Sequence, residues 1–156
     1  MAVVDILELP AVLAPGSAVL GLDLGEKTIG VAISDATRSI ASPLELIRKT
    51  KFTAEAERLF KLMDARRAGG MVIGLPVNMD GTEGPRAQST RAFARNLAKL
   101  TELPIALWDE RLSTAAVERE LIAADVSRNK RKAVVDQHAA VFILQGALDR
   151  LARMAG

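Results

Sequence analysis

The feature of this sequence that most limits its fold is one carboxylate, Asp23, at the end of an apolar run over residues 18–22. The run predicts a buried strand, and residues 24–35 continue through a glycine-containing turn into a second strand that returns antiparallel. An ionised side chain in a buried strand is strongly unfavourable unless it is paired or binds a metal. Asp23 therefore either caps the hairpin turn or belongs to a functional site.

The composition limits which kinds of site are possible. The chain has 156 residues, 49% hydrophobic and 26% charged, which predicts one globular domain with a substantial core. It contains no cysteine and one histidine, which excludes cysteine-based zinc sites and sites built from several histidines. A metal would have to be held by oxygen ligands, which favours magnesium or manganese.

The charge and hydropathy patterns indicate where the chain acts and on what. The net charge is only +2, so local clusters of basic residues say more about nucleic acid than the overall charge does. The first twenty residues include Asp5 and Glu8 and lack the basic start of a signal peptide. No apolar stretch approaches the roughly 20 residues of a membrane span. We expect a cytoplasmic protein, a monomer or weak homodimer, that does not associate with membranes.

Hydrophobic periodicity and turn residues divide the chain into elements. Residues 1–16 lack clear periodicity and are expected to form a flexible arm before a single domain at 17–156. Strands are predicted at about 17–24, 28–35, 39–48, 71–75 and 105–108. Helices are predicted at about 53–68, 85–100, 114–123 and 133–154, with the Gly69–Gly70 pair ending the first and a basic loop at 125–132.

The order of these elements predicts an α/β fold. Three consecutive strands form an antiparallel meander, and the two later strands alternate with helices that allow parallel crossovers. The third strand contains Pro43 and is expected at an edge of the sheet. We therefore predict a five-stranded mixed sheet, three antiparallel strands followed by two parallel ones, flanked by helices.

Further acidic residues stand where this fold could bring them together with Asp23. Asp109 and Glu110 follow the fifth strand, and Asp136 lies in the first turn of the last helix. Ligand chemistry in open α/β sheets gathers outside the carboxyl ends of the strands. Carboxylates that converge repel one another unless a divalent cation neutralises them. The alternatives are a strand-end acid paired with Arg111 and a helix-start acid favoured by the dipole.

This set of acids suits phosphodiester hydrolysis. Asp23, Glu110 and Asp136 are the candidate catalytic and metal-binding residues, and two oxygen-ligated Mg²⁺ or Mn²⁺ ions would supply a hydroxide and stabilise the leaving oxygen. No Ser-His-Asp or Cys-His set competes with them. His138 follows Asp136 by two residues, so a helix would place it on a different face.

Several basic and polar residues could position a nucleic-acid backbone near these acids. Arg86 begins a helix, where a cation gains nothing from the dipole, so an anionic partner would explain it. The alternative for the others is ordinary solvated surface charge. The candidate nucleic-acid-binding residues are Lys27, Asn78, Arg86, Arg111, Arg128, Lys130, Arg131 and Lys132.

Four blocks of the sequence resemble a known family, the YqgF-type proteins, described as pre-16S ribosomal RNA nucleases or Holliday-junction-resolvase-like proteins. The match extends over roughly residues 17–150, nearly the whole domain, and its four blocks lie in order at residues 21–32, 72–87, 109–114 and 132–145. The resemblance implies a ribonuclease-H-like fold and processing of the 5′ end of the small-subunit ribosomal RNA precursor. It also implies dependence on magnesium or manganese and places the family's carboxylates at Asp23, Glu110 and Asp136.

Three other functions remain to be separated from this one. A resolvase of Holliday junctions or other branched DNA would use the same acids, and a non-catalytic nucleic-acid-binding assembly factor would keep the fold without cleaving. Sugar kinases and actin-like proteins also begin with a strand, an aspartate and a hairpin. They need a duplicated second domain, which 156 residues do not hold.

Overall fold

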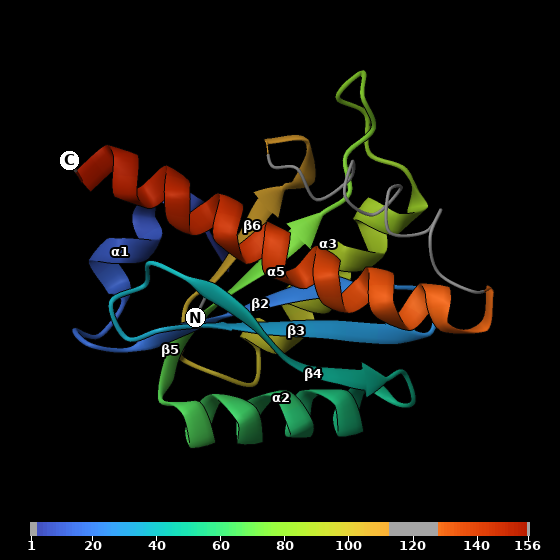
Figure 1. Ribbon diagram of the computed structural model, residues 1–156, viewed down its shortest axis with the longest axis horizontal. Coiled ribbons are helices and arrows are strands. Elements are labelled where there is room, and N and C mark those ends of the chain that lie inside the picture. Colours follow the sequence, from blue (N-terminus) through green and yellow to red (C-terminus); the bar gives the residue numbers. More distant parts are fainter. Residues whose placement is uncertain (1–2, 113–127, 156) are drawn as a thin grey trace.

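Six strands form one mixed sheet with helices on both faces (Figure 1). This computed structural model describes residues 3–112 and 128–155, with only the backbone described for 128–137. The strands are β1 (Val3–Val4), β2 (Ala18–Leu24), β3 (Thr28–Ser34), β4 (Ala41–Arg48), β5 (Ala68–Leu75) and β6 (Ile105–Asp109). The helices are α1 (Leu9–Val12), α2 (Phe52–Arg66), α3 (Pro85–Ala98) and α5 (Arg128–Ala155), with 3-10 turns η1 (Ile6–Glu8) and η2 (Glu110–Leu112).

The strand order β1-β6-β5-β2-β3-β4 confirms the predicted α/β arrangement. Strands β2, β3 and β4 form the antiparallel meander, and β4 lies at the sheet edge as expected from Pro43. Strands β5 and β6 run parallel to β2. The predicted number of five strands is wrong, because the short β1 pairs in parallel with β6 at the opposite edge.

The expectation of a flexible arm at residues 1–16 is wrong for its described part. Besides β1, this segment forms η1 and α1, and Leu9 is fully buried while Leu13 is only 7% exposed. Both leucines belong to the core cluster that lies beneath α5. Burial of these apolar side chains holds the segment against the domain, although its prolines and glycine obscure any periodicity.

Two element boundaries also differ from the prediction. The residues Gly69–Gly70 lie inside β5, because α2 already ends at Arg66, and the left-handed conformation of the next residue, Arg67 (φ 54°), closes the helix. The predicted basic loop at 125–132 is helical from Arg128 onward. Lysine and arginine are good helix formers, so a polar run without glycine or proline can extend a helix. The predicted helix at 114–123 lies outside the described residues.

Side chains alternate between two core clusters on the two faces of the sheet. Leu20, Leu22 and Ile73 face α2 and α3, whereas Val19 and Val72 face α5. Helix α5 lies very close to the sheet at Gly21, where an added Cβ would come within 2.6 Å of Leu144 Cβ. Glycine is needed there because any side chain would push the helix away. In the described part of the chain, no helix is both long enough and apolar enough to cross a membrane.

Candidate active site

Three parallel strands end at one edge of the sheet, and their register brings the candidate acids to it. Leu22 of β2 pairs with Ile73 of β5, and Gly74, the next residue of β5, pairs with Trp108 of β6. Asp23 follows Leu22 and so lies level with Gly74. Alternation along the strand places Asp23 on the face covered by α5.

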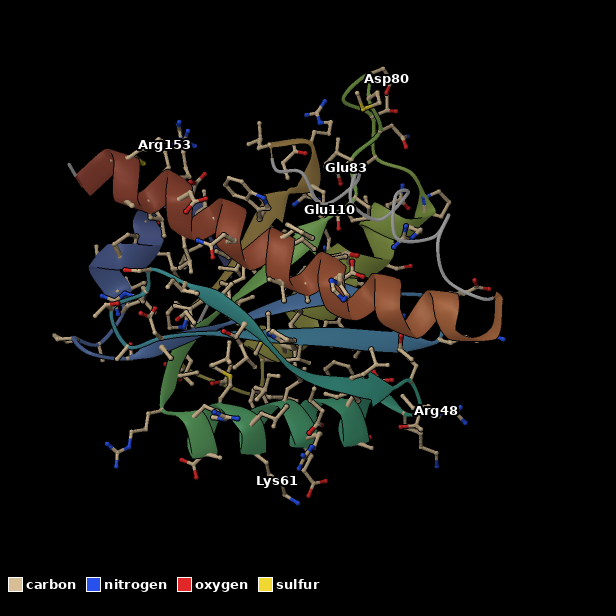
Figure 2. The ribbon with its side chains drawn as sticks, viewed as in Figure 1. Arg48, Lys61, Asp80, Glu83, Glu110 and Arg153 are labelled. Carbon is tan, nitrogen blue, oxygen red and sulfur yellow. The ribbon has the colours of Figure 1, made fainter. Side chains whose placement is uncertain are left out.

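Glu110 reaches the same place from β6. It opens η2 directly after the strand, and a Cβ added to Gly74 would lie 2.9 Å from its Oε1 atom. Figure 2 shows Glu110 at the upper edge of the sheet, near α5 and below the loop that carries Asp80. Asp23 is 1% exposed and Glu110 is 5% exposed. Two buried carboxyl groups therefore flank the bare backbone of Gly74.

The neighbouring acid Asp109 has a different role. Its carboxylate accepts hydrogen bonds from Arg111 Nη2 at 2.7 Å and from the Arg111 backbone N–H at 2.9 Å. Hydrogen bonding from the guanidinium lowers the pKa of Asp109 below its ordinary value. The pairing with Arg111 that the sequence left open for both acids thus belongs to Asp109, while Glu110 turns into the protein.

Asp136 lies in the N-terminal part of α5, and its side chain is not among those described. Its backbone position precedes Ala140 by one helical turn and Ile143 by two, and both residues are buried against the sheet. Ile143 contacts the position that a Gly74 side chain would occupy. That the Asp136 side chain joins those of Asp23 and Glu110 therefore stays a prediction.

A second group of residues forms a pocket beside Glu110. The pocket has a volume of about 360 Å³ and is lined by the loop after β5, the start of α3, Glu110 and Arg111. The loop is held by its own contacts: the Asn78 N–H donates to Thr82 O at 2.9 Å, and Arg111 Nη1 donates to Asn78 O at 3.4 Å. Three of the predicted nucleic-acid-binding residues line this pocket, Asn78, Arg86 and Arg111, and the first and last of them also order its wall.

Arg86 and Lys27 lie at the same end of the sheet. The Arg86 side chain lines the pocket beside Glu110, and its Nη2 donates to Leu24 O at 3.2 Å, one residue beyond Asp23. Lys27 is exposed in the β2–β3 turn, and its carbonyl accepts from the Lys49 N–H at 2.9 Å. Both residues lie at the end of β2 that carries Asp23, and their contact with a phosphate stays a prediction.

The other predicted cations are known only by their backbone positions. Arg128, Lys130, Arg131 and Lys132 lie in the first two turns of α5, rather than in a loop. Positive charge at a helix N-terminus opposes the macrodipole, which an anionic partner would offset. His138 is exposed on the same helix.

No sequence pattern indicated a second pocket at this end of the sheet, on the face of α2 and α3. Lys49 and Glu55 line it together with Phe93, and it has a volume of about 640 Å³. Glu55 has the position of an ordinary first-turn acid, but it is only 7% exposed, whereas Glu57 is a surface residue. Helical spacing is the signal that separates the two glutamates: Glu55 lies one turn before Leu59 on the buried face of α2, whereas Glu57 lies one turn before the exposed Lys61.

The site fits a hard divalent cation as far as it is described. Asp23 and Glu110 offer only oxygen donors, and more than nine-tenths of each residue is buried, so a cation would offset the charge that burial makes unfavourable. Within residues 3–112 and the described side chains of α5, no three acidic or histidine residues are grouped closely enough to hold a metal. A third ligand would have to come from outside that set.

Sequence comparisons place the chain among known proteins. The family model described as "RuvX: Holliday junction resolvase" matches residues 17–150. A protein of Phenylobacterium zucineum (strain HLK1) named "Putative pre-16S rRNA nuclease" is 69% identical over 153 residues, which cover 97% of this chain and 98% of that protein. A protein of the same name from Rhodopseudomonas palustris (strain BisA53) is 65% identical over 150 residues, or 96% of this chain and 92% of that protein.

Solved structures agree on the fold. The Thermus thermophilus RuvC in complex with a Holliday junction substrate matches with a TM-score of 0.53 at 13% identity, over 89% of this chain and 96% of that chain. The yeast mitochondrial Holliday junction resolvase Ydc2 also matches with a TM-score of 0.53, at 15% identity, over 96% of this chain and 84% of that chain. These likenesses confirm the predicted ribonuclease-H-like fold, and the matches in sequence confirm the resemblance of the four blocks: the chain belongs to the RuvX, or YqgF-type, family.

Proposed function

We propose that this protein is a divalent-metal-dependent nuclease that hydrolyses phosphodiester bonds at the 5′ end of pre-16S ribosomal RNA in the cytoplasm. The observation that carries the proposal is the burial of Asp23 and Glu110 on either side of Gly74, at the carboxyl edge of three parallel strands. The names of the relatives, which share more than half of its residues, support the ribosomal RNA precursor as substrate.

In this proposal Asp23, Glu110 and Asp136 hold Mg²⁺ or Mn²⁺, two ions in all. When bound, such ions supply a hydroxide at neutral pH and stabilise the leaving oxygen. The side chains of Asp23 and Glu110 are fixed before substrate arrives, because the sheet and α5 enclose them. Their close packing keeps bulk water from the carboxylates, which strengthens their attraction for a cation.

The basic residues would position the RNA backbone. Arg86 uses one of its five N–H donors on Leu24 O within the described structure, which leaves the guanidinium able to bind a phosphate next to Asp23. Arg111 is held in place by Asp109 at the rim of the pocket beside Glu110. Lys27, Asn78 and the cations at the start of α5 would extend this contact along the strand.

The test is cleavage of an end-labelled RNA that carries the 5′ leader of the small-subunit ribosomal RNA. Mg²⁺ or Mn²⁺ should support cleavage and EDTA should stop it. Asp23→Asn, Glu110→Gln and Asp136→Asn should each lower the rate by more than about 100-fold. Loss of a residue that only hydrogen-bonds to a metal ligand already costs up to about 100-fold, and loss of a ligand itself should cost more. Asp64→Asn, which changes an exposed acid of α2, is the matched control and should cleave normally.

A second candidate function is resolution of branched DNA, which is favoured by the description of the family model. A four-way DNA junction assayed beside the RNA separates the two substrates. Faster cleavage of the junction would replace RNA by DNA in the proposal. Binding of either substrate without cleavage under any metal condition would favour a non-catalytic assembly factor.

A further inference from the structure

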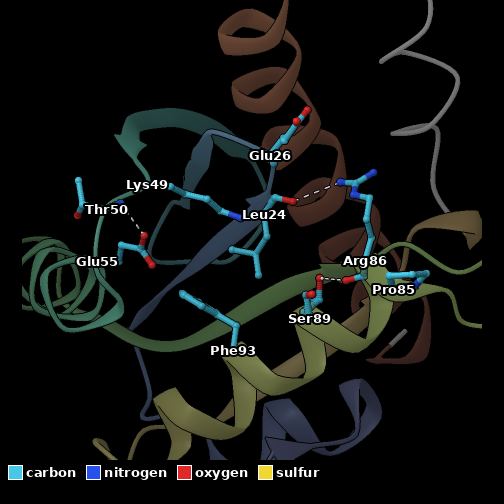
Figure 3. A pocket seen from close by; sticks show the side chains of 11 residues that line it. Leu24, Glu26, Lys49, Thr50, Glu55, Pro85, Arg86, Ser89 and Phe93 are labelled. Carbon is cyan, nitrogen blue, oxygen red and sulfur yellow. Dashed lines mark hydrogen bonds between the residues drawn. The ribbon is translucent and has the colours of Figure 1, made fainter.

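The larger pocket at the carboxyl end of β2 has no role in the chemistry described above. It lies between the β2–β3 turn, the start of α2 and the first turns of α3 (Figure 3). Leu24 lines it from β2 and therefore points to the opposite face of the sheet from Asp23. Arg86 lines both this pocket and the one beside Glu110, so the two pockets meet at one side chain.

The walls of the pocket suit a flat aromatic ligand. Leu24 and Phe93 provide half-buried apolar surface, and Pro85 extends it to the rim. The Phe93 ring packs edge-on against Phe52, with centroids 5.4 Å apart and an interplanar angle of 85°, which fixes its orientation. The volume of about 640 Å³ is within the range of small-molecule sites and is sufficient for a nucleobase with its sugar.

One end of the pocket holds a buried carboxylate. Glu55 of α2 is 7% exposed, and its Oε2 accepts a hydrogen bond from the Thr50 backbone N–H at 2.9 Å. That bond fixes the carboxylate at the pocket wall, as Figure 3 shows. A carboxylate has about four lone-pair positions, so it can accept further hydrogen bonds from a ligand. It accepts only, so it favours a ligand that presents hydrogen-bond donors, such as the N–H groups of a nucleobase.

The other side of the pocket carries cations. The side chain of Lys49 extends across toward Leu24, and Arg86 lies beyond it on α3 (Figure 3). A ligand with N–H groups at one end and a phosphate at the other would match this order of charges. A nucleotide has that form, with the edge of the base at Glu55 and the backbone at Arg86.

We propose that this pocket binds an unpaired guanine of the RNA substrate, next to the phosphodiester that is cleaved. Guanine is the base whose Watson–Crick edge presents two adjacent donors, N1–H and the N2 amino group, which a carboxylate can accept together. Adenine and cytosine present one amino group beside an acceptor, and uracil presents one N–H between two carbonyls. Proteins commonly read single-stranded RNA through such splayed-out bases.

This inference rests on the proposed function, since it assigns to the nuclease a preference for guanine beside its cleavage site. Binding measured without divalent ions tests it independently of cleavage. The probes are fluorescein-labelled oligouridine RNAs with one central guanosine, inosine, adenosine or cytidine, and the readout is the Kd for the full-length protein by fluorescence anisotropy in EDTA. Inosine differs from guanosine by loss of the N2 amino group alone.

We expect the guanosine RNA to bind about tenfold more tightly than the adenosine and cytidine RNAs, in the range of a bidentate base contact. The inosine RNA should lie between them. Glu55→Gln should remove this preference, because an amide has one acceptor oxygen and one donor group and cannot accept from both N–H groups of guanine in the way a carboxylate does. The amide oxygen can still accept from Thr50, so the wall of the pocket should be kept. Glu57→Gln is the matched control: it makes the same change in charge on an exposed side chain of the same helix and should keep the preference.

The outcomes separate the two proposals. Failure to bind any of the RNAs would contradict the proposed function itself. Equal affinity for all four would overturn the guanine pocket alone, and a preference that persists in Glu55→Gln would show that another group reads the base. Should Glu55→Gln fail to fold, as judged by its thermal unfolding, the difference between guanosine and inosine RNAs on the natural protein still decides the proposal.

Discussion

Gly74 determines how closely the acidic side chain of Glu110 can approach the sheet. It lies level with Asp23 in the next strand, and α5 and Glu110 occupy the space where a side chain would stand. Because Gly74 has no Cβ, the Ile143 side chain of α5 and the Glu110 carboxylate can both pack against its backbone. The site thus depends on a residue that carries no chemistry of its own.

Gly74→Ala should damage both stability and cleavage. The new methyl would lie 2.9 Å from Glu110 Oε1 and would also strike Ile143, so the carboxylate and α5 must shift. We expect the free energy of unfolding to fall by about 1–3 kcal/mol, as for other overpacked cores, and the cleavage rate to fall with it. Urea denaturation and the RNA cleavage assay measure the two effects.

Gly84→Ala is the control for steric clash, because its added Cβ would have only ordinary contact, 3.8 Å from Asn78 Nδ2. Gly84 is the N-cap of α3, so this variant should lose only the small stability that glycine has over alanine at that position. The close approach over Gly74 would be refuted if both alanine variants unfolded at the same urea concentration as the natural protein.

Asp35 gives the stability a pH dependence at low pH. Hydrogen bonds from the Thr37 hydroxyl and the N–H groups of Ser39 and Ile40 lower its pKa from 3.8 to about 2. Because the folded pKa is the lower one, the stabilisation is complete above pH 3.8 and is lost as the pH falls toward 2. Asp35→Asn should therefore be less stable than the natural protein above pH 3.8 and should approach it near pH 2.

Urea denaturation of both proteins across this range of pH provides the measurement. A difference in unfolding free energy that stays constant from pH 5 to pH 2, in place of one that shrinks, would mean that the hydrogen bonds to Asp35 do not stabilise its charged form.

The N-terminal segment is a structural element of the domain. Strand β1 extends the sheet beyond β6, and α1 lies beside the C-terminal half of α5 in Figure 1. Leu9 joins the same core cluster as Leu148. The segment thus covers apolar surface at the end of α5 that lies away from the carboxyl edge.

Leu9→Ala should destabilise the protein by about 2–5 kcal/mol, because the side chain is fully buried and its removal leaves a cavity. Leu7→Ala, which changes a side chain with 45% exposure two residues earlier, should have a much smaller effect. Urea denaturation compares them. If both variants lost only a similar small amount of unfolding free energy, the segment would be a loose arm, as the sequence predicted.

Across the whole molecule, local patterns predicted the elements with strong periodicity, and pairing between distant segments determined the rest. The apolar runs at β2 and β5 and the amphipathic α2 and α3 were evident, and the four blocks identified the family. β1 is two residues long and forms only because it pairs with the edge strand β6. No local sequence pattern indicates that pairing. The predicted start of α5 is too late because residues 128–132 are charged helix formers, which show no apolar periodicity.

The same distinction holds for the site. Adjacent acids in the sequence could not show which one pairs with Arg111, since that depends on how η2 turns after β6; the structure assigns Asp109 to the pair and buries Glu110. Helical spacing puts Glu55 on the apolar face of α2, but only tertiary packing shows that a pocket lies beside its carboxylate. Charge and spacing predict candidates, but the direction of each side chain comes from packing.

In the proposed function, the acids at the carboxyl edge together hold the catalytic cations. Anomalous diffraction at the manganese edge, from crystals of the protein grown with Mn²⁺, tests it most directly. We predict a manganese peak within about 2.5 Å of carboxylate oxygens of both Asp23 and Glu110, with Asp136 completing the site. A well-ordered map at saturating Mn²⁺ with no peak between Asp23 and Glu110 would contradict the account.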